Sequence, residues 1–189
     1  MAITTLNNRS INRSDTAASS QVWTATSATA SDFQAAGITE ADMWRLTTGY
    51  SGVATPIASN WERADTEDFA VLGTGLSESS GIFTFPSTGY YFITFQATFV
   101  RNGDTRNVGL NIQHTTNDSS WTDLAYSSTF IQQTESDATY STAVVTAITH
   151  ILDTSNDKVR FTAGATSVTT SNDTNAQHTG IVCIKLADT

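Results

Sequence analysis

The stretch "GYYFITFQATFVR", residues 89–101, constrains the fold more than any other part of this chain. Large apolar residues occupy every second position, and in a β-strand such positions point to the same side. The stretch therefore predicts a strand with one face in a core. The same alternation recurs twice downstream, at Val108, Leu110 and Ile112 and at Val182, Ile184 and Leu186.

Turn-forming residues divide the remaining sequence into many short segments. Charged residues make up only 14% of the chain, and Thr, Ser, Asn and Asp, which favour strands or turns, are abundant instead. We expect strands near 43–50, 54–62, 67–73, 80–86, 89–101, 105–115, 121–131, 138–153, 157–164 and 176–187. The "NGD" at 102–104 predicts a hairpin. The fold class is then all-β, an antiparallel jelly-roll β-sandwich, with at most short helical turns near 31–44.

Residues 1–38 differ from the rest and predict an extended N-terminal arm ahead of a jelly-roll domain at 39–189. The arm is small and polar, with too little apolar surface to offset the entropy of ordering by itself. We expect it to dock on a neighbour or on its own domain. The candidate attachment residues are Leu6, Arg9, Ile11 and Arg13.

The stretch "GIFTFPSTGYYFITF", residues 81–95, predicts a corner between two strands. Pro86 fixes φ and has no N–H to donate, so it belongs at a strand end, and Gly89 permits a positive φ. We expect the aromatic residues on both sides to bury against one another rather than to line an enzyme pocket. The predicted core corner comprises Leu76, Phe83, Phe85, Pro86, Gly89, Tyr91, Ile93 and Phe95.

In this spacing the corner resembles the jelly rolls of complement C-one-q globular heads and tumour necrosis factors. In that family a strand ends in an aromatic, a Pro–x–x–Gly corner follows, and the next strand begins with Tyr and aromatics. The closing "TGIVCIKL" resembles the family's last strand, with Gly180 at its small-residue position. Ile93 and Val71 depart from the pattern, because the family prefers Phe and Asn or Asp there. The resemblance covers roughly residues 43–187.

The segment that begins "ITEADMWRLTTGYSG" is also similar to virion proteins of marine bacteriophages, notably those of cyanobacteria. The similarity lies in the overall sequence and in a composition that is low in Lys and rich in Thr. It implies a virion structural role, in which such jelly rolls occur as trimers on capsids or at fibre tips. The implied location is the virion, after synthesis in the cytoplasm of a host bacterium.

The charge balance argues against a nucleic-acid partner. The formal net charge is −9, and Lys158 and Lys185 are the only lysines, whereas phosphate binding needs clustered basic residues. The start "MAITTLNNRS" has no apolar signal core, and no stretch approaches the length of a membrane span. We therefore expect neither nucleic acid nor membrane as a partner.

Nothing in the sequence assembles a catalytic or cofactor site. His114, His150 and His178 lack metal-ligand spacing, no GxSxG motif occurs, and the only cysteine, Cys183, sits in an apolar run that predicts a buried thiol. We expect no enzyme and no cofactor.

Two groups of polar residues have both a ligand-binding and a structural interpretation. The acidic loop at Glu62, Asp65, Glu67 and Asp68, with "TTNDSSWTD" and "TSNDTN", suits calcium, but no twelve-residue calcium-loop pattern matches, so a solvated turn is the favoured interpretation. Trp121 and Tyr126 lie beside Asn and Asp and suit a sugar, although strand-start anchors look the same.

Residues 142–152 are apolar on both faces of the expected strand, which predicts burial once in the core and once under a partner. The candidate trimer interface comprises Val145, Ala147, His150 and Ile151. Protonation of His150 in such an interface would make assembly sensitive to pH.

Together these features predict a trimeric capsid-decorating, or cement, protein that binds the major capsid protein or other virion proteins through its arm. The alternative is a tail- or head-fibre tip that binds host surface glycan. That role calls for a long shaft or adaptor, whereas this chain has only a short leader. A polysaccharide depolymerase is disfavoured because no acid/base pair can be named.

Overall fold

The computed structural model describes residues 21–25, 31–35, 37–65, 69–134 and 136–189. The chain divides into two compact units, Met1–Thr39 and Glu40–Thr189, next to the boundary predicted after residue 38. In the first unit, β1 (Gln21–Ala25) pairs antiparallel with β2 (Ser31–Ala35). The predicted attachment residues Leu6, Arg9, Ile11 and Arg13 lie outside the described residues.

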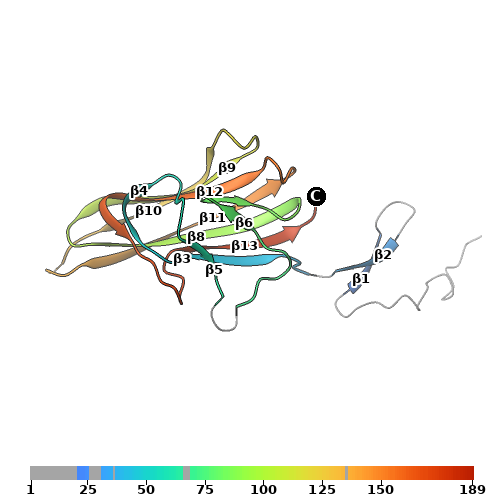
Figure 1. Cartoon of the computed structure of the whole chain (residues 1–189), viewed down its shortest axis with the longest axis horizontal. Coiled ribbons are helices and arrows are strands. Elements are labelled where there is room, and N and C mark those ends of the chain that lie inside the picture. The colour runs from blue at the N-terminus through green and yellow to red at the C-terminus, as the bar shows by residue number, and fades with distance from the viewer. Residues whose placement is uncertain (1–20, 26–30, 36, 66–68, 135) are drawn as a thin grey trace, which may run out of the picture. The chain divides into compact units, whose positions relative to one another are not determined.

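The second unit, called the body below, is built from antiparallel strands (Figure 1). Its strands are β3 (Ala41–Leu46), β4 (Tyr50–Ala54), β5 (Trp61–Arg63), β6 (Ser77–Ser79), β7 (Ile82–Thr84), β8 (Gly89–Arg101), β9 (Thr105–Thr115), β10 (Thr122–Ile131), β11 (Thr139–Ile151), β12 (Lys158–Thr170) and β13 (Gly180–Ala187). The described residues contain no helix, which agrees with the all-β fold class, and the segment near 31–44, where at most short helical turns were expected, holds strands instead. There β2 pairs with β1, and β3 pairs with β13.

The strands of the body form two layers. One, the β8 layer, has the order β11-β8-β13-β3-β5. The other, the β9 layer, has the order β10-β9-β12, with β7 and β4 on the far side of β12 and β6 beside β7. This arrangement confirms the antiparallel sandwich expected from the alternating sequence.

Strand β12 belongs to both layers. Residues 158–164 pair with β9, whereas Thr169 and Thr170 pair with Val100 and Phe99 of β8. The change of layer coincides with a register shift between Ala165 and Thr169. Gly164, with a φ of +120°, allows the backbone of β4 to approach closely at this bend. The sandwich is consequently almost closed along this side.

The turn at residues 102–104 does not form the predicted hairpin. Strand β8 pairs with β11 and β13, and β9 pairs with β10 and β12, so the turn carries the chain from one layer to the other. Each of these strands has an apolar row on one side. Packing the two rows against each other buries more apolar surface than pairing β8 with β9 in one sheet would. The turn itself lies where the sequence indicated.

The predicted corner is confirmed as part of the core. The chain turns between Phe85 and Gly89, and the Tyr91 hydroxyl donates to the carbonyl oxygen of Ser87 at 2.9 Å. A Cβ atom on Gly89 would lie 2.4 Å from the carbonyl oxygen of Ala187, so only glycine fits there. The other large corner side chains are buried in one cluster: Leu76, Phe83, Phe85, Tyr91, Ile93 and Phe95.

Aromatic rings join the two layers across the core. Phe161 of β12 lies 5.0 Å from Phe95 of β8 and 5.3 Å from Phe83, measured between ring centroids. Trp44 and Trp61 meet Phe83 edge-on at 5.5 and 5.3 Å. Such edge-to-face contacts stabilise a core beyond the area they bury.

Candidate functional site

The outward side of the β8 layer carries a group of hydrophobic side chains that the described residues of the body leave partly or largely exposed. We call it the apolar face, and it comprises Tyr90, Phe92, Val144, Ile148, Val182 and Ile184. Ile148 is 58% exposed and stands beside Phe92 in the strand register, and Phe92 stands beside Ile184. The register therefore makes one continuous row across β11, β8 and β13.

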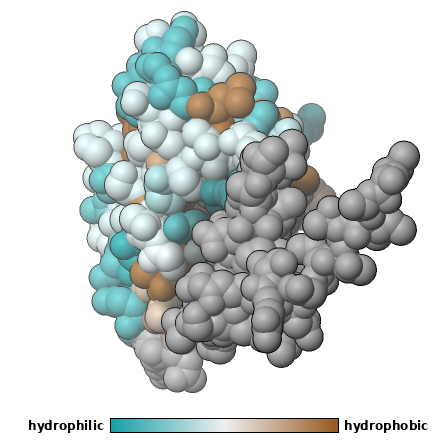
Figure 2. Space-filling model, turned by 90° about the vertical axis from the view of Figure 1, so that its right-hand side faces the viewer, coloured by the Kyte–Doolittle hydropathy of each residue, from teal (hydrophilic) through white to brown (hydrophobic). Residues whose placement is uncertain are grey.

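The apolar face lies on a strongly acidic protein but contains no acidic or basic residue. The segments 90–96, 142–150 and 182–184 include no Asp, Glu, Lys or Arg, although the net charge is −9. Their polar residues are mostly Thr, together with Gln96 and His150. In Figure 2, which views one end of the molecule, brown residues form only small groups among white and teal ones. Monomeric proteins seldom leave contiguous apolar areas uncovered.

Three of the four residues that the sequence predicted for a trimer interface are wrong, because they face the protomer's own core. Val145 and Ile151 are buried in the protomer's own core, and Ala147 packs against that core. His150 points outward and stacks on Tyr90 at 4.1 Å between ring centroids. The sequence showed apolar residues on both faces of this strand but could not tell which face was inward. The exposed residues of β11 are Tyr140, Thr142, Val144, Thr146, Ile148 and His150.

The three histidines do not share a site. His114 pairs in register with Val159 near the end of β9, and His150 lies on the outward side of β11. His178 Nδ1 shares a hydrogen bond with Ser171 Oγ at 3.2 Å, in the segment between β12 and β13. Across the described ranges, no three His, Cys, Asp or Glu side chains stand close enough to hold a metal ion.

The acidic loop after β5 neutralises a buried arginine. Arg45 is 3% exposed, and its guanidinium lies 3.0 Å from Glu62 and 2.6 Å from Asp65. Glu67 and Asp68, the other carboxylates of the predicted calcium loop, lie outside the described residues. A buried cation needs such partners because an unpaired charge in the interior is costly. These two carboxylates thus have a structural role that the sequence did not reveal.

The other oxygen-rich loops also use their side chains internally. Asn117 Oδ1 accepts hydrogen bonds from the backbone N–H groups of Ser119 and Ser120 at 3.1 and 2.8 Å. Asp173 Oδ1 accepts from the N–H groups of Asn175 and Ala176, and these bonds hold the pKa of Asp173 below its usual range. Both loops are side-chain-capped turns of a familiar kind.

A second buried ionic network, also missed from sequence, ties β3 to the segment before β6. Asp42 is 2% exposed, and both of its oxygens accept hydrogen bonds from the Arg63 guanidinium at 3.1 Å. The same carboxylate accepts from the Leu76 N–H at 2.7 Å and from Trp44 Nε1 at 2.9 Å. Arg63 and Leu76 lie far from Asp42 in the chain, and no local pattern links them to it.

We expect Cys183 to resist a thiol reagent until the protein unfolds. Burial raises the pKa of its thiol, and the nearby carboxylates of Asp42 and Glu40 raise it further, so the reactive thiolate is scarce at neutral pH. Ellman's reagent should react slowly with the native chain and rapidly in concentrated guanidinium chloride. Rapid labelling of native protein would contradict the buried position.

No protein-family model and no curated protein matches this chain. Among solved structures, it is similar to the Eiger TNF of S. frugiperda, with a TM-score of 0.61 and 15% identity over 79% of this chain and 93% of that one. Murine APRIL at pH 5.0 matches with a TM-score of 0.56 and 17% identity over 78% and 98% of the two chains. The body has a tumour necrosis factor-like jelly-roll fold. At these identities the similarity establishes the fold alone.

The described part of the chain offers no membrane-spanning helix.

Proposed function

We propose that this chain is a non-catalytic, self-associating virion protein, a homotrimer that decorates a bacteriophage capsid. The apolar face is the observation that carries the proposal. A hydrophobic row on the sheet of a tumour necrosis factor-like body leaves apolar surface exposed to water, and the same surface of two further copies, arranged about a threefold axis, would cover it. The virion location rests on the sequence resemblance to marine bacteriophage proteins.

The charge distribution favours other copies as the cover of the apolar face. Each chain carries a formal charge of −9, so two bodies repel each other at most approach angles. The strand segments of the apolar face carry none of that charge, so contact there avoids juxtaposing carboxylates. Tyr90, Phe92 and Ile148 would then be anchors, since large apolar and aromatic side chains dominate the energy of such interfaces.

Sedimentation of the purified chain tests self-association. We expect the mass of three chains at micromolar concentrations, with the protomer mass appearing only on dilution. A chain that sediments as a single protomer at every concentration would refute the proposal.

The arm is proposed to attach the assembled protein to the shell. Residues 1–37 carry Arg9, Arg13, Asp15 and Asp32, whose charges cancel, so the acidity belongs to the rest of the chain. Three arms on one trimer would multiply weak contacts through their effective concentration.

Deleting residues 1–30 is expected to leave a folded trimer that no longer joins the particle. Circular dichroism and sedimentation check the fold and the mass, and incorporation is measured by adding purified protein to particles that lack it. The full chain is the matched control. Incorporation of the truncated protein at the level of the full chain would refute attachment through the arm.

A further inference from the structure

The outward side of the β9 layer carries exposed aromatic residues that neither the core nor the proposed self-association uses. Tyr126 and Phe130 of β10 are 55% and 63% exposed. Four residues along a strand correspond to about 13 Å, so two separate rings are presented along one strand. The apolar face lies on the opposite layer, so trimer formation there would leave these rings open.

Tyr126 is held in a fixed position on the sheet. Its ring passes over Gly109 of β9, where an added Cβ atom would lie 3.0 Å from Tyr126 Cε2. The Tyr126 hydroxyl and Asn107 Oδ1 are 3.3 Å apart, which directs the ring toward the start of β9. One face of the ring rests on backbone and the other remains available to a ligand.

Phe130, four residues after Tyr126 on β10, lines a groove at the start of β9. The groove has a volume of about 310 Å³ and is lined by Asp104, Thr105, Arg106, Phe130, Ile131 and Gln132. The backbone N–H of Gln133 donates to Asp104 Oδ1 at 2.7 Å, and Arg101 donates to Thr105 at 2.5 Å, so one wall is fixed. The Arg106 side chain is exposed, and its guanidinium makes no hydrogen bond or ion pair with any residue that the structure describes.

The chemistry of this surface suits a carbohydrate. Sugars present apolar C–H faces, which stack on aromatic rings, and hydroxyl edges, which bond planar amide, carboxylate and guanidinium groups. Tyr126 and Phe130 supply the rings, and Asn107, Gln132 and Arg106 supply the polar groups. Asp104 offsets the charge of Arg106, whereas a nucleic acid would need a surplus of basic residues.

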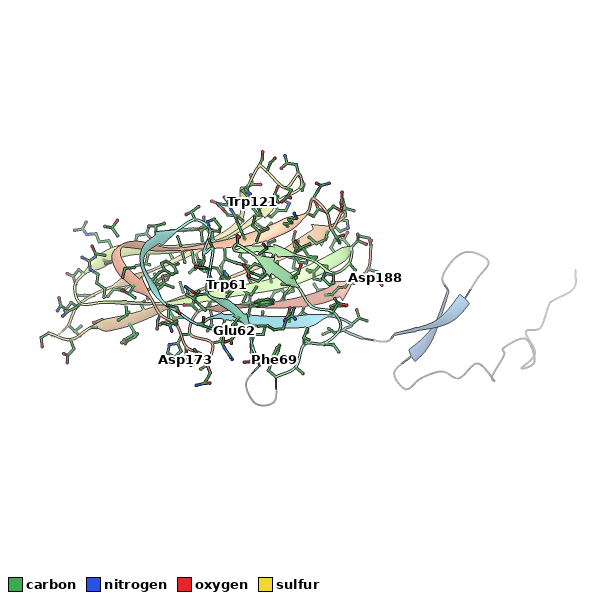
Figure 3. The ribbon with its side chains drawn as sticks, viewed as in Figure 1. Trp61, Glu62, Phe69, Trp121, Asp173 and Asp188 are labelled. Carbon is green, nitrogen blue, oxygen red and sulfur yellow. The ribbon has the colours of Figure 1, made fainter. Side chains whose placement is uncertain are left out.

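Trp121, the other sugar candidate from the sequence, is excluded from this surface by its packing. Figure 3 shows it at the outer margin of the body. The Arg160 guanidinium covers its ring at 4.4 Å from the centroid, and Arg160 Nε donates to Gln113 Oε1 at 2.8 Å. Trp121 is therefore a structural anchor, and Tyr126 differs from it in having an open ring face.

We infer that the surface formed by Tyr126, Asn107, Arg106, Phe130 and the adjacent groove binds a glycan, of the class found on bacterial surfaces. Within the body, this surface lies on the layer opposite the apolar face, so its test does not depend on self-association. Binding there would attach a virion protein to a cell surface. The exposed rings and the groove are the observations that favour a receptor-binding role.

The test uses the full chain on an array of purified bacterial O-antigen chains and capsular polysaccharides, with single-stranded poly-dT as a comparison probe. We expect binding to at least one glycan and none to poly-dT. Tyr126→Ala and Phe130→Ala should each weaken binding of that glycan about tenfold, a change of the size typical for loss of one stacking ring. Tyr126→Phe, which keeps the ring, should retain most of the affinity.

Two further variants separate this site from other effects. Gly109→Ala should weaken glycan binding by displacing the Tyr126 ring, although it removes no aromatic group. Tyr140→Ala removes an aromatic residue of similar exposure from the other layer and should leave binding unchanged. Titration of the Ile148→Asp variant with an oligosaccharide from the bound glycan tests the site whether or not the chain self-associates.

Three results would overturn the inference. They are binding of no glycan on the array, binding of poly-dT alone, and glycan binding that survives the double substitution Tyr126→Ala and Phe130→Ala.

Discussion

Replacing Asp42 by alanine is expected to lower the free energy of unfolding by about 3–5 kcal/mol. The substitution leaves the Leu76 N–H and Trp44 Nε1 without the acceptor they have in the native protein. It also removes the bidentate partner of the Arg63 guanidinium. Buried donors that lose an acceptor keep their full desolvation penalty, which is why the expected loss is large.

Urea denaturation followed by tryptophan fluorescence measures this effect. The matched control is Asp65→Ala, which removes a carboxylate from an arginine at a site where the carboxylate is 70% exposed. Arg45 keeps Glu62 in that variant, so the expected loss is below about 1 kcal/mol. Equal losses in the two variants would show that the Asp42 network does not stabilise the fold as described.

Replacing Ile148 by aspartate is expected to convert the proposed trimer to single protomers. Ile148 stands at the β11 end of the apolar row, next to Phe92. A carboxylate at this position would be buried without a partner in any assembly that covers the apolar face, and three copies would bring three such charges together. Because the side chain is 58% exposed in the protomer, the fold itself should be unaffected.

Sedimentation at several concentrations measures the change, and circular dichroism verifies the fold. Ser128→Asp is the matched control, since it places the same charge on an exposed position of β10, in the opposite layer. A trimer that persists in Ile148→Asp would exclude the apolar face as the interface. Dissociation in Ser128→Asp would move the interface to the β9 layer.

Strand identity in this protein could be predicted where alternation was long and regular. Residues 89–101 and 105–115 are strands with the bounds that the sequence indicated, and the corner at 85–89 lies in the core as expected. In these segments each strand has an apolar row on one side, and in β9 it consists of Val108, Leu110 and Ile112, so local sequence and burial agree. The expectations at 54–62, 67–73 and 80–86 were less accurate, because the three-residue strands β5, β6 and β7 carry little periodicity. Residues 69–73 hold no strand, only a bridge from Leu72 to Ala41.

The pairing of strands and the contacts of buried charges could not be read from local sequence. The "NGD" turn is compatible with a hairpin. The chain crosses to the other layer there because this buries the apolar rows of both β8 and β9. The Asp42–Arg63 pair joins residues from separate strands, as does the Arg45–Glu62 pair. Likewise, the sequence offered Trp121 and Tyr126 alike as sugar candidates, and only the structure shows Arg160 over the Trp121 ring and Gly109 beneath the Tyr126 ring.

Strand β12 threads through both halves of the sandwich, and this continuity has a mechanical consequence. The two layers cannot slide apart or peel away one at a time without rupturing hydrogen bonds on either side of the bend at Gly164. Amide protons in β8 and β9 should therefore exchange with solvent through one shared cooperative opening. If the body is attached at one end and pulled at the other, we therefore expect the two layers to resist the force as one cooperative unit.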